Sequence, residues 1–279
     1  MSAEPAETES HKAFLRTLVS GCHILHFHQV LDAYGHLSAR HPEQPDRFFI
    51  PRNTAPGTVS SQYDLVEYHI HDGEPVNSDA PKGYVERYIH SEIYKKFPGV
   101  MSVIHSHSTS VIPYTISSVP MQPCFHMGGF LGTSVPVFDI SKHYADEDIR
   151  DLLIRNTRLG AALACCFTHG SVYSNGSGEV QEPSQPVTLM RGHGYTVCGN
   201  RIEESVLRAI YTKENAAIQT NTLLSHAAFH GASLGPPAID YIHEDEVAAS
   251  TEMTRWSFER PWNLWLKEVE LAGLYTNLV

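Results

Sequence analysis

The segment from Gly83 to Ile104 constrains the fold of this chain most, because it predicts a helix that folds back along a buried strand. Apolar side chains recur near helical spacing between Gly83 and Phe97. Pro98 and Gly99 then end the helix. The apolar run from Val100 to Ile104 is typical of a strand inside a sheet. The start of the helix is therefore expected to lie along this strand.

Four side chains around this unit predict one divalent metal site. His105 and His107 are two residues apart, so an extended strand presents both imidazoles on one face. Glu86 begins the predicted helix, and His193 lies between glycines in Arg191-Gly192-His193-Gly194. Three imidazoles and a carboxylate complete a four-ligand shell that zinc accepts, and manganese, cobalt and ferrous iron suit the same ligands.

Each of these residues has an ordinary alternative when it is taken alone. The chain contains 18 histidines, so some pairs at this spacing arise by chance. Glu86 can be a solvated helix residue, and His193 can be a turn histidine. His90 lies one helical turn after Glu86 and is predicted to support that carboxylate. The triplet His69-Ile70-His71 precedes Asp72-Gly73 and is typical of a hairpin surface, with a second metal site as the alternative.

Further motifs lie before and after these residues along the chain. They comprise a glycine turn, three strand segments, a turn with its flanking strands, and a long helix: Tyr34–Arg40, Phe48–Arg52, Asp64–Val66, Asp72–Val76, Val187–Cys198 and Glu203–Gln219. With these motifs the chain resembles the class II aldolase/adducin family over about residues 12–226. In that family a helix-borne Glu, a His-x-His strand and a later His hold a catalytic metal, which implies this role for the four residues above.

The resemblance also implies a fold and an assembly. The expected fold class is α/β, a three-layer α/β/α sandwich with a mostly antiparallel central sheet, whereas periodicity alone predicts only mixed α and β. The family is usually a cyclic tetramer with active sites at subunit boundaries, so a homotetramer is expected. Glu86 is then expected both to bind the metal and, once substrate displaces it, to carry a proton.

Three departures from the family bear on the substrate. Where the sugar-phosphate aldolases have an Asn and two serines that bind the substrate phosphate, this chain has His36, Tyr84 and Val85. A neutral imidazole, a phenol and an isopropyl group do not reproduce a ring of small donors around a phosphate dianion. A small, non-phosphorylated substrate is therefore expected.

The expected reaction is cleavage of a carbon–carbon bond. The aldolases use a tyrosine about twenty residues after the His-x-His pair, where this chain has His126-Met127; His126 can serve as an acid or base near neutral pH. Arg191 is the candidate for gripping a substrate carboxylate, with a salt bridge to a surface acid as the alternative. These features favour the branches that decarboxylate hydroxy, keto or aromatic acids through a metal-stabilised enolate. Retro-aldol cleavage, a non-haem Fe(II) oxygenase and a non-catalytic adducin-like scaffold are the alternatives.

Composition sets further limits. The net charge is −11 and no cluster of lysine and arginine is present, which argues against a nucleic-acid partner. No apolar stretch reaches eighteen residues, and the acidic N-terminus is unlike a signal peptide, so no membrane partner is expected. Five cysteines without a disulfide-framework spacing suit a reducing compartment. A cytoplasmic location is expected.

The predicted organisation is one catalytic domain with additions at both ends. Residues 1–10 are expected to form a disordered head, and residues 11–235 the catalytic domain. A loop insertion at 168–186, rich in Gly, Ser, Pro and Asn, is either a mobile lid or disordered. Residues 236–279 are expected to form a C-terminal helical extension whose tryptophans pack on another subunit.

Overall fold

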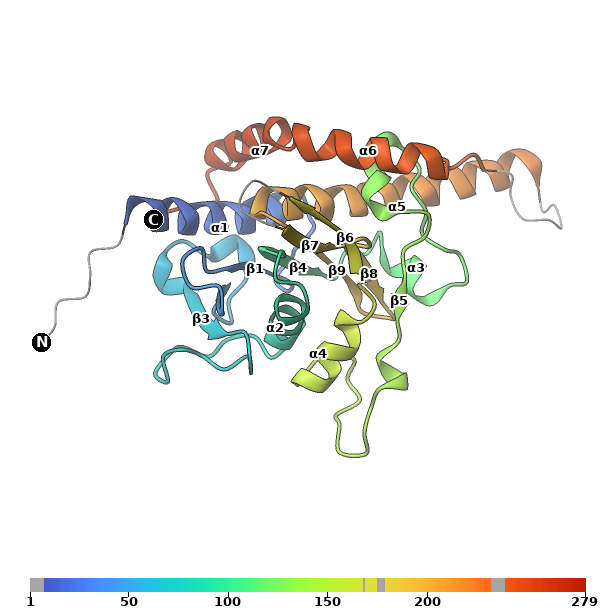
Figure 1. Cartoon of the computed structure of the whole chain (residues 1–279). Coiled ribbons are helices and arrows are strands. Elements are labelled where there is room, and N and C mark those ends of the chain that lie inside the picture. The colour runs from blue at the N-terminus through green and yellow to red at the C-terminus, as the bar shows by residue number, and fades with distance from the viewer. Residues whose placement is uncertain (1–7, 168, 175–178, 232–238) are drawn as a thin grey trace, which may run out of the picture.

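A seven-stranded sheet runs through the centre of the computed structural model, which describes residues 8–167, 169–174, 179–231 and 239–279 (Figure 1). Its order is β3-β2-β1-β4-β9-β8-β5, and all neighbouring strands are antiparallel except β5 and β8. The strands of this sheet are β1 His36–Arg40, β2 Arg47–Pro51, β3 Leu65–His69, β4 Ser102–Ser106, β5 Val137–Phe138, β8 Val187–Met190 and β9 Gly194–Gly199.

Helices cover both faces of this sheet. The helices are α1 Glu9–Phe27, α2 Arg87–Lys96, α3 Ile112–Ile116, α4 Thr157–Ala164, α5 Ile202–His230, α6 Glu244–Ser257 and α7 Glu259–Leu271. In Figure 1, α1, α5 and α7 lie above the sheet, and α2 and α4 lie below it. The expected three-layer sandwich with a mostly antiparallel sheet is confirmed. None of the helices in the described ranges has the length and apolar content needed to cross a membrane.

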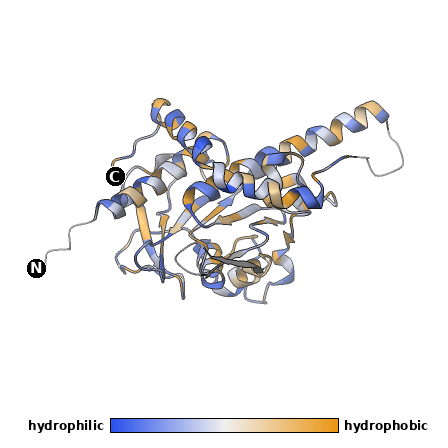
Figure 2. Cartoon of the chain, turned by 45° about the horizontal axis from the view of Figure 1, so that its top comes forward, coloured by the Kyte–Doolittle hydropathy of each residue, from blue (hydrophilic) through white to orange (hydrophobic). Residues whose placement is uncertain are grey.

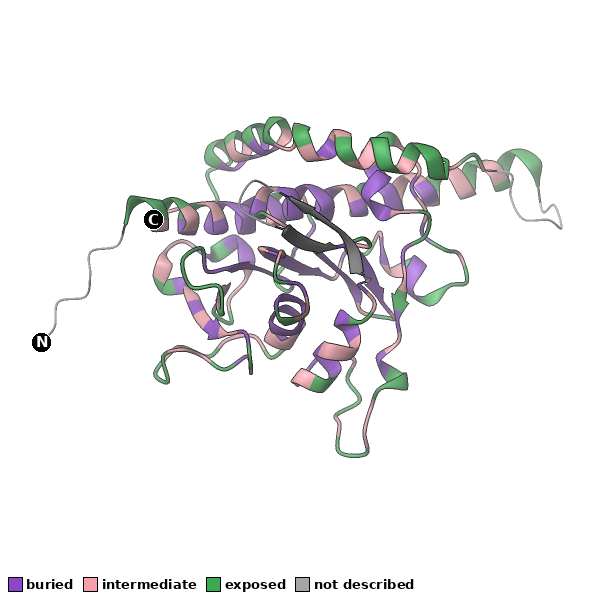
Figure 3. Cartoon of the chain, viewed as in Figure 1, coloured by how far each residue is buried: buried purple, intermediate pink, exposed green. Residues whose placement is uncertain are grey.

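The central strands β4 and β9 supply the core on both sides. Ile104 and Val197 belong to the hydrophobic cluster under α1 and α5, whereas Val103 and Cys198 belong to the cluster under α2 and α4. All four side chains are fully buried, and Figure 3 shows the inner faces of the helices buried against the same strands. Successive residues of a strand point to opposite faces, so the middle of a strand between two helical layers carries apolar side chains on both faces.

The insertion after α4 differs from the predicted loop. Residues His169–Ser174 (β6) and Glu179–Pro183 (β7) form a separate antiparallel pair, while 168 and 175–178 lie outside the described residues. The surrounding Gly, Ser and Pro favoured a loop, but these two runs carry valine and tyrosine, which favour strands. At the N-terminus, α1 already begins at Glu9, where the Thr8 hydroxyl accepts a hydrogen bond from the His11 N–H; residues 1–7 of the predicted head lie outside the described ranges.

The C-terminal extension consists of α6 and α7, and it packs on its own chain. Trp262 and Trp265 are buried in the cluster with α1, whereas Trp256 is 68% exposed. Hydrophobic and hydrophilic residues alternate around these helices (Figure 2), so an apolar face of α7 turns toward the body of the protein. The prediction that the tryptophans pack on another subunit is thus wrong for two of the three.

Candidate metal centre

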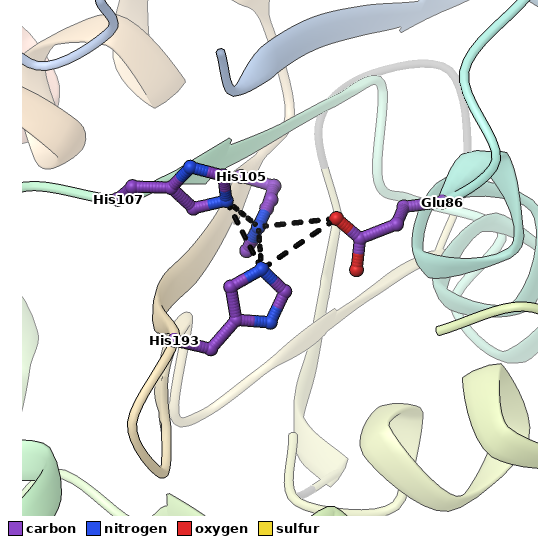
Figure 4. A group of neighbouring side chains, drawn as sticks. All are labelled: Glu86, His105, His107 and His193. Carbon is purple, nitrogen blue, oxygen red and sulfur yellow. Dashed lines mark hydrogen bonds and ion pairs between the residues drawn. The ribbon is translucent and has the colours of Figure 1, made fainter. Parts of the chain in front are cut away.

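Four side chains from three parts of the chain converge at one end of the central strands (Figure 4). Glu86 is the residue immediately before α2, His105 lies in β4 and His107 follows that strand. His193 lies in the turn between β8 and β9. Their ligand atoms all lie within 4.8 Å of one another. The structure thus brings together all four residues that the sequence predicted as ligands.

The three imidazoles form a nearly equilateral triangle. The Nε2 atom of His107 is 3.0 Å from those of His105 and His193, which are 3.3 Å apart. Glu86 Oε2 lies 3.7 Å from His105 Nε2 and 3.6 Å from His193 Nε2. A point about 2.1 Å from all three nitrogens, the zinc–imidazole bond length, lies about 1.1 Å outside their plane. The donor set therefore fits a single divalent ion.

A glycine turn allows His193 to approach the strand end. The backbone of Gly194 packs directly on Ser106, and a Cβ atom added at Gly194 would collide with the Ser106 carbonyl oxygen. Gly192 adopts φ +65°, a left-handed conformation that glycine tolerates. Glycine is thus required at 194 by the close contact with Ser106, and glycine is favoured at 192 by the left-handed backbone conformation.

A hydrogen-bonded pair fixes the tautomer of His105. Its Nδ1 lies 3.3 Å from Thr196 Oγ1, the residue directly opposite in β9. The Thr196 hydroxyl donates to Met190 Sδ at 3.3 Å. Because that hydrogen is directed to the sulfur, the Thr196 oxygen accepts from His105 Nδ1–H. His105 Nε2 then carries a free lone pair toward the cluster, as a metal ligand requires.

One carboxylate oxygen of Glu86 accepts a backbone hydrogen bond, and the other oxygen faces the three histidines. The backbone N–H of Ile154 donates to Glu86 Oε1 at 3.0 Å, which leaves Oε2 facing the histidines. Burial raises the pKa of Glu86 to about 8, and the Ile154 N–H opposes this effect. In the metal-free protein the carboxyl is thus protonated at neutral pH. A nearby cation would favour its ionised form.

The histidines are held in the neutral form. Burial, and to a smaller extent the neighbouring His107, lowers the pKa of His193 to about 4. Burial also lowers the pKa of His105 well below its ordinary value, with smaller contributions from His193 and His107. For His107, burial lowers the pKa while Asp32 opposes it. Neutral imidazole is the form that binds metal.

A cavity of about 400 Å³ opens beside Glu86 and His107. It is lined by aromatic, small apolar and a few polar residues: Ala33, Tyr34, Gly35, His36, Asn53, Thr54, Ala55, Tyr84, Val85, Glu86, His107 and Leu153. The Tyr84 hydroxyl donates to the Thr54 carbonyl, so its hydrogen is already engaged. A second hollow of about 360 Å³ reaches His107 from the side of Lys213. The candidate metal centre is thus accessible to a small molecule.

Three other predicted residues do not join the cluster. Arg191 Nε donates to Asp139 Oδ1 at 2.6 Å, because β5 pairs with β8 and leaves Asp139 beside Arg191. His126 is exposed in the short 3-10 helix His126–Leu131 and does not line the cavity. His90, predicted to support Glu86, bonds His36 and Ser38 instead. Glu86 precedes the first helical residue, so the one-turn spacing does not apply to the pair.

Several residues of the centre could not be found from the sequence. Thr196 and Met190 orient His105, and the Ile154 N–H holds Glu86. The role of Thr196 follows from strand register, and that of Ile154 from a loop conformation. Neither has a local sequence signal.

Comparison with known proteins agrees with this geometry. The model of the Class II Aldolase and Adducin N-terminal domain matches residues 16–220. The chain is 55% identical over 266 residues to decarboxylase tropJ of Talaromyces stipitatus, covering 95% of this chain and 97% of that protein. It is 27% identical over 183 residues to the 3,4-dihydroxyphthalate decarboxylase of a Terrabacter strain, covering 66% of each chain.

Solved structures show the same fold. The L-fuculose 1-phosphate aldolase of Glaciozyma antarctica PI12 superimposes with a TM-score of 0.66 at 18% identity, covering 99% of this chain and 97% of that one. An aldolase II superfamily protein of Pseudomonas syringae gives 0.65 at 19% identity, with 98% and 96% covered. The chain therefore belongs to the class II aldolase and adducin family and is an enzyme of the lyase type.

Proposed function

We propose that this enzyme is a divalent-metal-dependent decarboxylase that acts on a small, non-phosphorylated hydroxy, keto or aromatic acid. The observation that carries the proposal is the convergence of Glu86 with three neutral imidazoles beside an open cavity. The similarity to decarboxylase tropJ over nearly the whole chain supports decarboxylation. Zinc is the first choice of metal, because tetrahedral nitrogen and oxygen ligands suit it.

The chemistry is the loss of carbon dioxide from an acid. A bound divalent ion supplies a positive charge that favours an enolate at the carbon from which the carboxylate departs. The carbon–carbon bond breaks, its electron pair stays with the substrate, and a proton must then reach that carbon. Once substrate displaces Glu86 from the ion, its Oε2 would hold this proton, because the carboxyl lines the cavity.

The cavity favours a flat substrate. The rings of His36 and Tyr84 lie 4.7 Å apart, and Val85 and Leu153 add apolar surface. Relatives in three bacteria are named 3,4-dihydroxyphthalate decarboxylases, which supports an aromatic acid with adjacent oxygens. We therefore use 3,4-dihydroxyphthalate as the first test substrate.

Arg191 and His126 are proposed to take part in catalysis, although neither lies at the candidate metal centre. Arg191 would have to leave Asp139 before it could grip a substrate carboxylate. His126 is exposed beside α6, so it would act as an acid or base only at the site of a neighbouring subunit. This second role requires an oligomer, and a homotetramer is the assembly we propose. A monomer in light scattering would exclude the role of His126.

The deciding experiment compares two His-x-His pairs. The double variant His105→Ala, His107→Ala removes two proposed ligands. The matched control is His69→Ala, His71→Ala, a pair with the same spacing whose rings lie 5.2 Å apart on a hairpin and whose His71 is exposed. We expect about one divalent ion per chain in the wild type and the control, with none in the first variant.

Carbon dioxide release from 3,4-dihydroxyphthalate is then measured on the same proteins. We expect release by the wild type and the control, and none by the His105, His107 variant. Metal-independent release, or equal release by both double variants, would contradict the proposal. Aldehyde formation without carbon dioxide would favour retro-aldol cleavage, which uses the same enolate stabilisation. Uptake of dioxygen by an iron-loaded protein would favour the oxygenase.

A further inference from the structure

A buried chain of hydrogen bonds leads from the interior to the cavity. His36 Nδ1 lies 2.6 Å from His90 Nε2, and His90 Nδ1 lies 2.6 Å from Ser38 Oγ. Ser38 Oγ in turn lies 2.6 Å from the Tyr94 hydroxyl. All four side chains are at most 3% exposed. His36 lines the cavity, whereas Tyr94 lies at the inner end of the chain.

The hydroxyl of Tyr94, at the inner end of the chain of hydrogen bonds, determines which partner donates in each of them. Ser38 is the one acceptor for the Tyr94 hydroxyl hydrogen in the part of the chain that the structure describes, and the Val103 backbone N–H also donates to the Tyr94 oxygen. Tyr94 therefore donates to Ser38, and Ser38 donates to His90 Nδ1. His90 Nε2–H then donates to His36 Nδ1. The opposite direction would leave a buried phenol hydrogen without an acceptor, which is unfavourable.

His36 must consequently carry its own hydrogen on Nε2, the nitrogen that remains for the cavity. This is a neutral donor, because Nδ1 of the same ring accepts the hydrogen bond from His90 and so carries no hydrogen. Its ring packs 4.7 Å from the ring of Tyr84 and 5.2 Å from that of His105. Among the described residues that line the cavity there is no lysine or arginine.

We propose that His36 Nε2–H binds a carboxylate oxygen of the substrate, on a group that stays in the product, and that His90, Ser38 and Tyr94 are positioning residues that fix this hydrogen. The inference rests on the proposed function. A single neutral donor matches one carboxylate oxygen and does not neutralise a phosphate dianion. A hydrogen bond to the departing carboxylate would weaken as carbon dioxide forms and would favour the ground state, which does not help catalysis.

The tautomer can be observed directly in the wild type. We would label the histidines with ¹⁵N, load the protein with zinc, which is diamagnetic, and record two-bond ¹H–¹⁵N correlations without substrate. His36→Gln and His90→Gln assign the two sets of signals. We expect both imidazoles to be neutral and protonated on Nε2 at pH 7. Protonation of either ring on Nδ1 would overturn the proposal.

The positioning role is tested at a residue that does not line the cavity. Ser38→Ala removes the link between Tyr94 and His90, so we expect the His36 signals to divide between two tautomers. The matched control is Ser91→Ala, another fully buried serine, whose hydroxyl makes no hydrogen bond within the described residues. We expect the control to keep the wild-type spectrum. An unchanged His36 tautomer in Ser38→Ala would contradict the role of the chain.

Binding is tested with phthalate, a flat diacid that lacks the hydroxyl groups of the test substrate. We expect His36→Phe to bind phthalate about 10- to 100-fold more weakly than the zinc-loaded wild type, as for a hydrogen bond to a charged group. His36→Gln, which keeps an N–H donor, should recover part of the loss. Equal phthalate affinity in His36→Phe and the wild type would overturn the proposal, as would no phthalate binding by the wild type.

Kinetics separate this inference from the proposed function. Because the bound carboxylate stays on the product, His36→Phe should raise KM and leave kcat within a few-fold. An equal fall in kcat and kcat/KM with unchanged KM would contradict this assignment. If the wild type released no carbon dioxide from any acid, the proposed function would fail, while the tautomer and the phthalate measurements would still decide the role of His36.

Discussion

Metal binding should release a proton from one identifiable residue. Glu86 is buried and its pKa is raised to about 8, so the metal-free protein holds a proton on this carboxyl at neutral pH. A divalent ion binds the ionised form and must displace that proton. The histidines contribute little, because burial has lowered their pKa values and they are already neutral. Metal affinity should therefore fall as pH falls below 8.

The magnitude follows from the pKa. A carboxyl with a pKa of about 8 is about 0.9 protonated at pH 7 and about 0.25 protonated at pH 8.5. Zinc binding should accordingly release about 0.9 proton at pH 7 and about 0.25 proton at pH 8.5. The apparent association constant should be about eightfold lower at pH 7 than at pH 8.5. Glu86→Gln has no proton to release, so its zinc affinity should be lower but nearly independent of pH.

Isothermal titration calorimetry measures the number of protons directly. Zinc is titrated into metal-free protein in buffers that differ in ionisation enthalpy, and the slope of the observed enthalpy gives the protons released. Two results would refute the reasoning. One is a wild-type release near zero at pH 7. The other is the same release from Glu86→Gln, which would place the proton on another group.

Three substitutions test the parts around the ligands. Thr196→Val removes the acceptor for His105 Nδ1–H, so zinc affinity measured by titration calorimetry should fall about 10- to 100-fold. The control is Thr188→Val, at a buried hydroxyl without a hydrogen bond in the described residues, and it should leave the measured zinc affinity unchanged. Gly194→Ala should prevent zinc binding or folding, as followed by metal content and circular dichroism, because its Cβ would collide with the Ser106 carbonyl; a zinc-loaded, folded variant would contradict the packing. Tyr84→Phe should retain carbon dioxide release and lose about 1 kcal/mol of stability in urea, since its hydroxyl donates to the backbone carbonyl of Thr54; a fall in kcat of more than tenfold would instead indicate that this phenol takes part in proton transfer.

Local signals in the sequence were enough to predict which ligands converge. A two-residue spacing in an apolar run, a Pro-Gly break and a Gly-His-Gly turn each act over a few residues, and each appears where it was expected. The family resemblance then supplied the three layers and the mostly antiparallel sheet, which periodicity does not contain. The helix and the strand beside the ligands could be predicted from local patterns, since α2 and β4 carry clear helical and strand patterns.

Partners set by register or by loop conformation could not be predicted. Thr196 and His36 flank His105 because β9 and β1 pair with β4 in one particular register. His90 was assigned to Glu86 by helical spacing, but the helix begins one residue later and turns His90 toward β1. Arg191 meets Asp139 only because the short strand β5 joins the edge of the sheet. These contacts join segments distant in the sequence, and no local pattern encodes them.

The distance between the ligands along the chain has a consequence for the order of folding. Glu86 and His193 are 107 residues apart, and the turn that carries His193 reaches His107 only after β9 has paired with β4. Long-range contacts of this kind form slowly, because the intervening loop must be closed before they contribute any stability. We expect zinc uptake in refolding to follow the pairing of β4 with β9, detected by hydrogen exchange of their backbone amides, and uptake ahead of that pairing would contradict this order. On this order, a metal ion bound by these ligands would join segments of a sheet that has already formed, and it would not nucleate the fold.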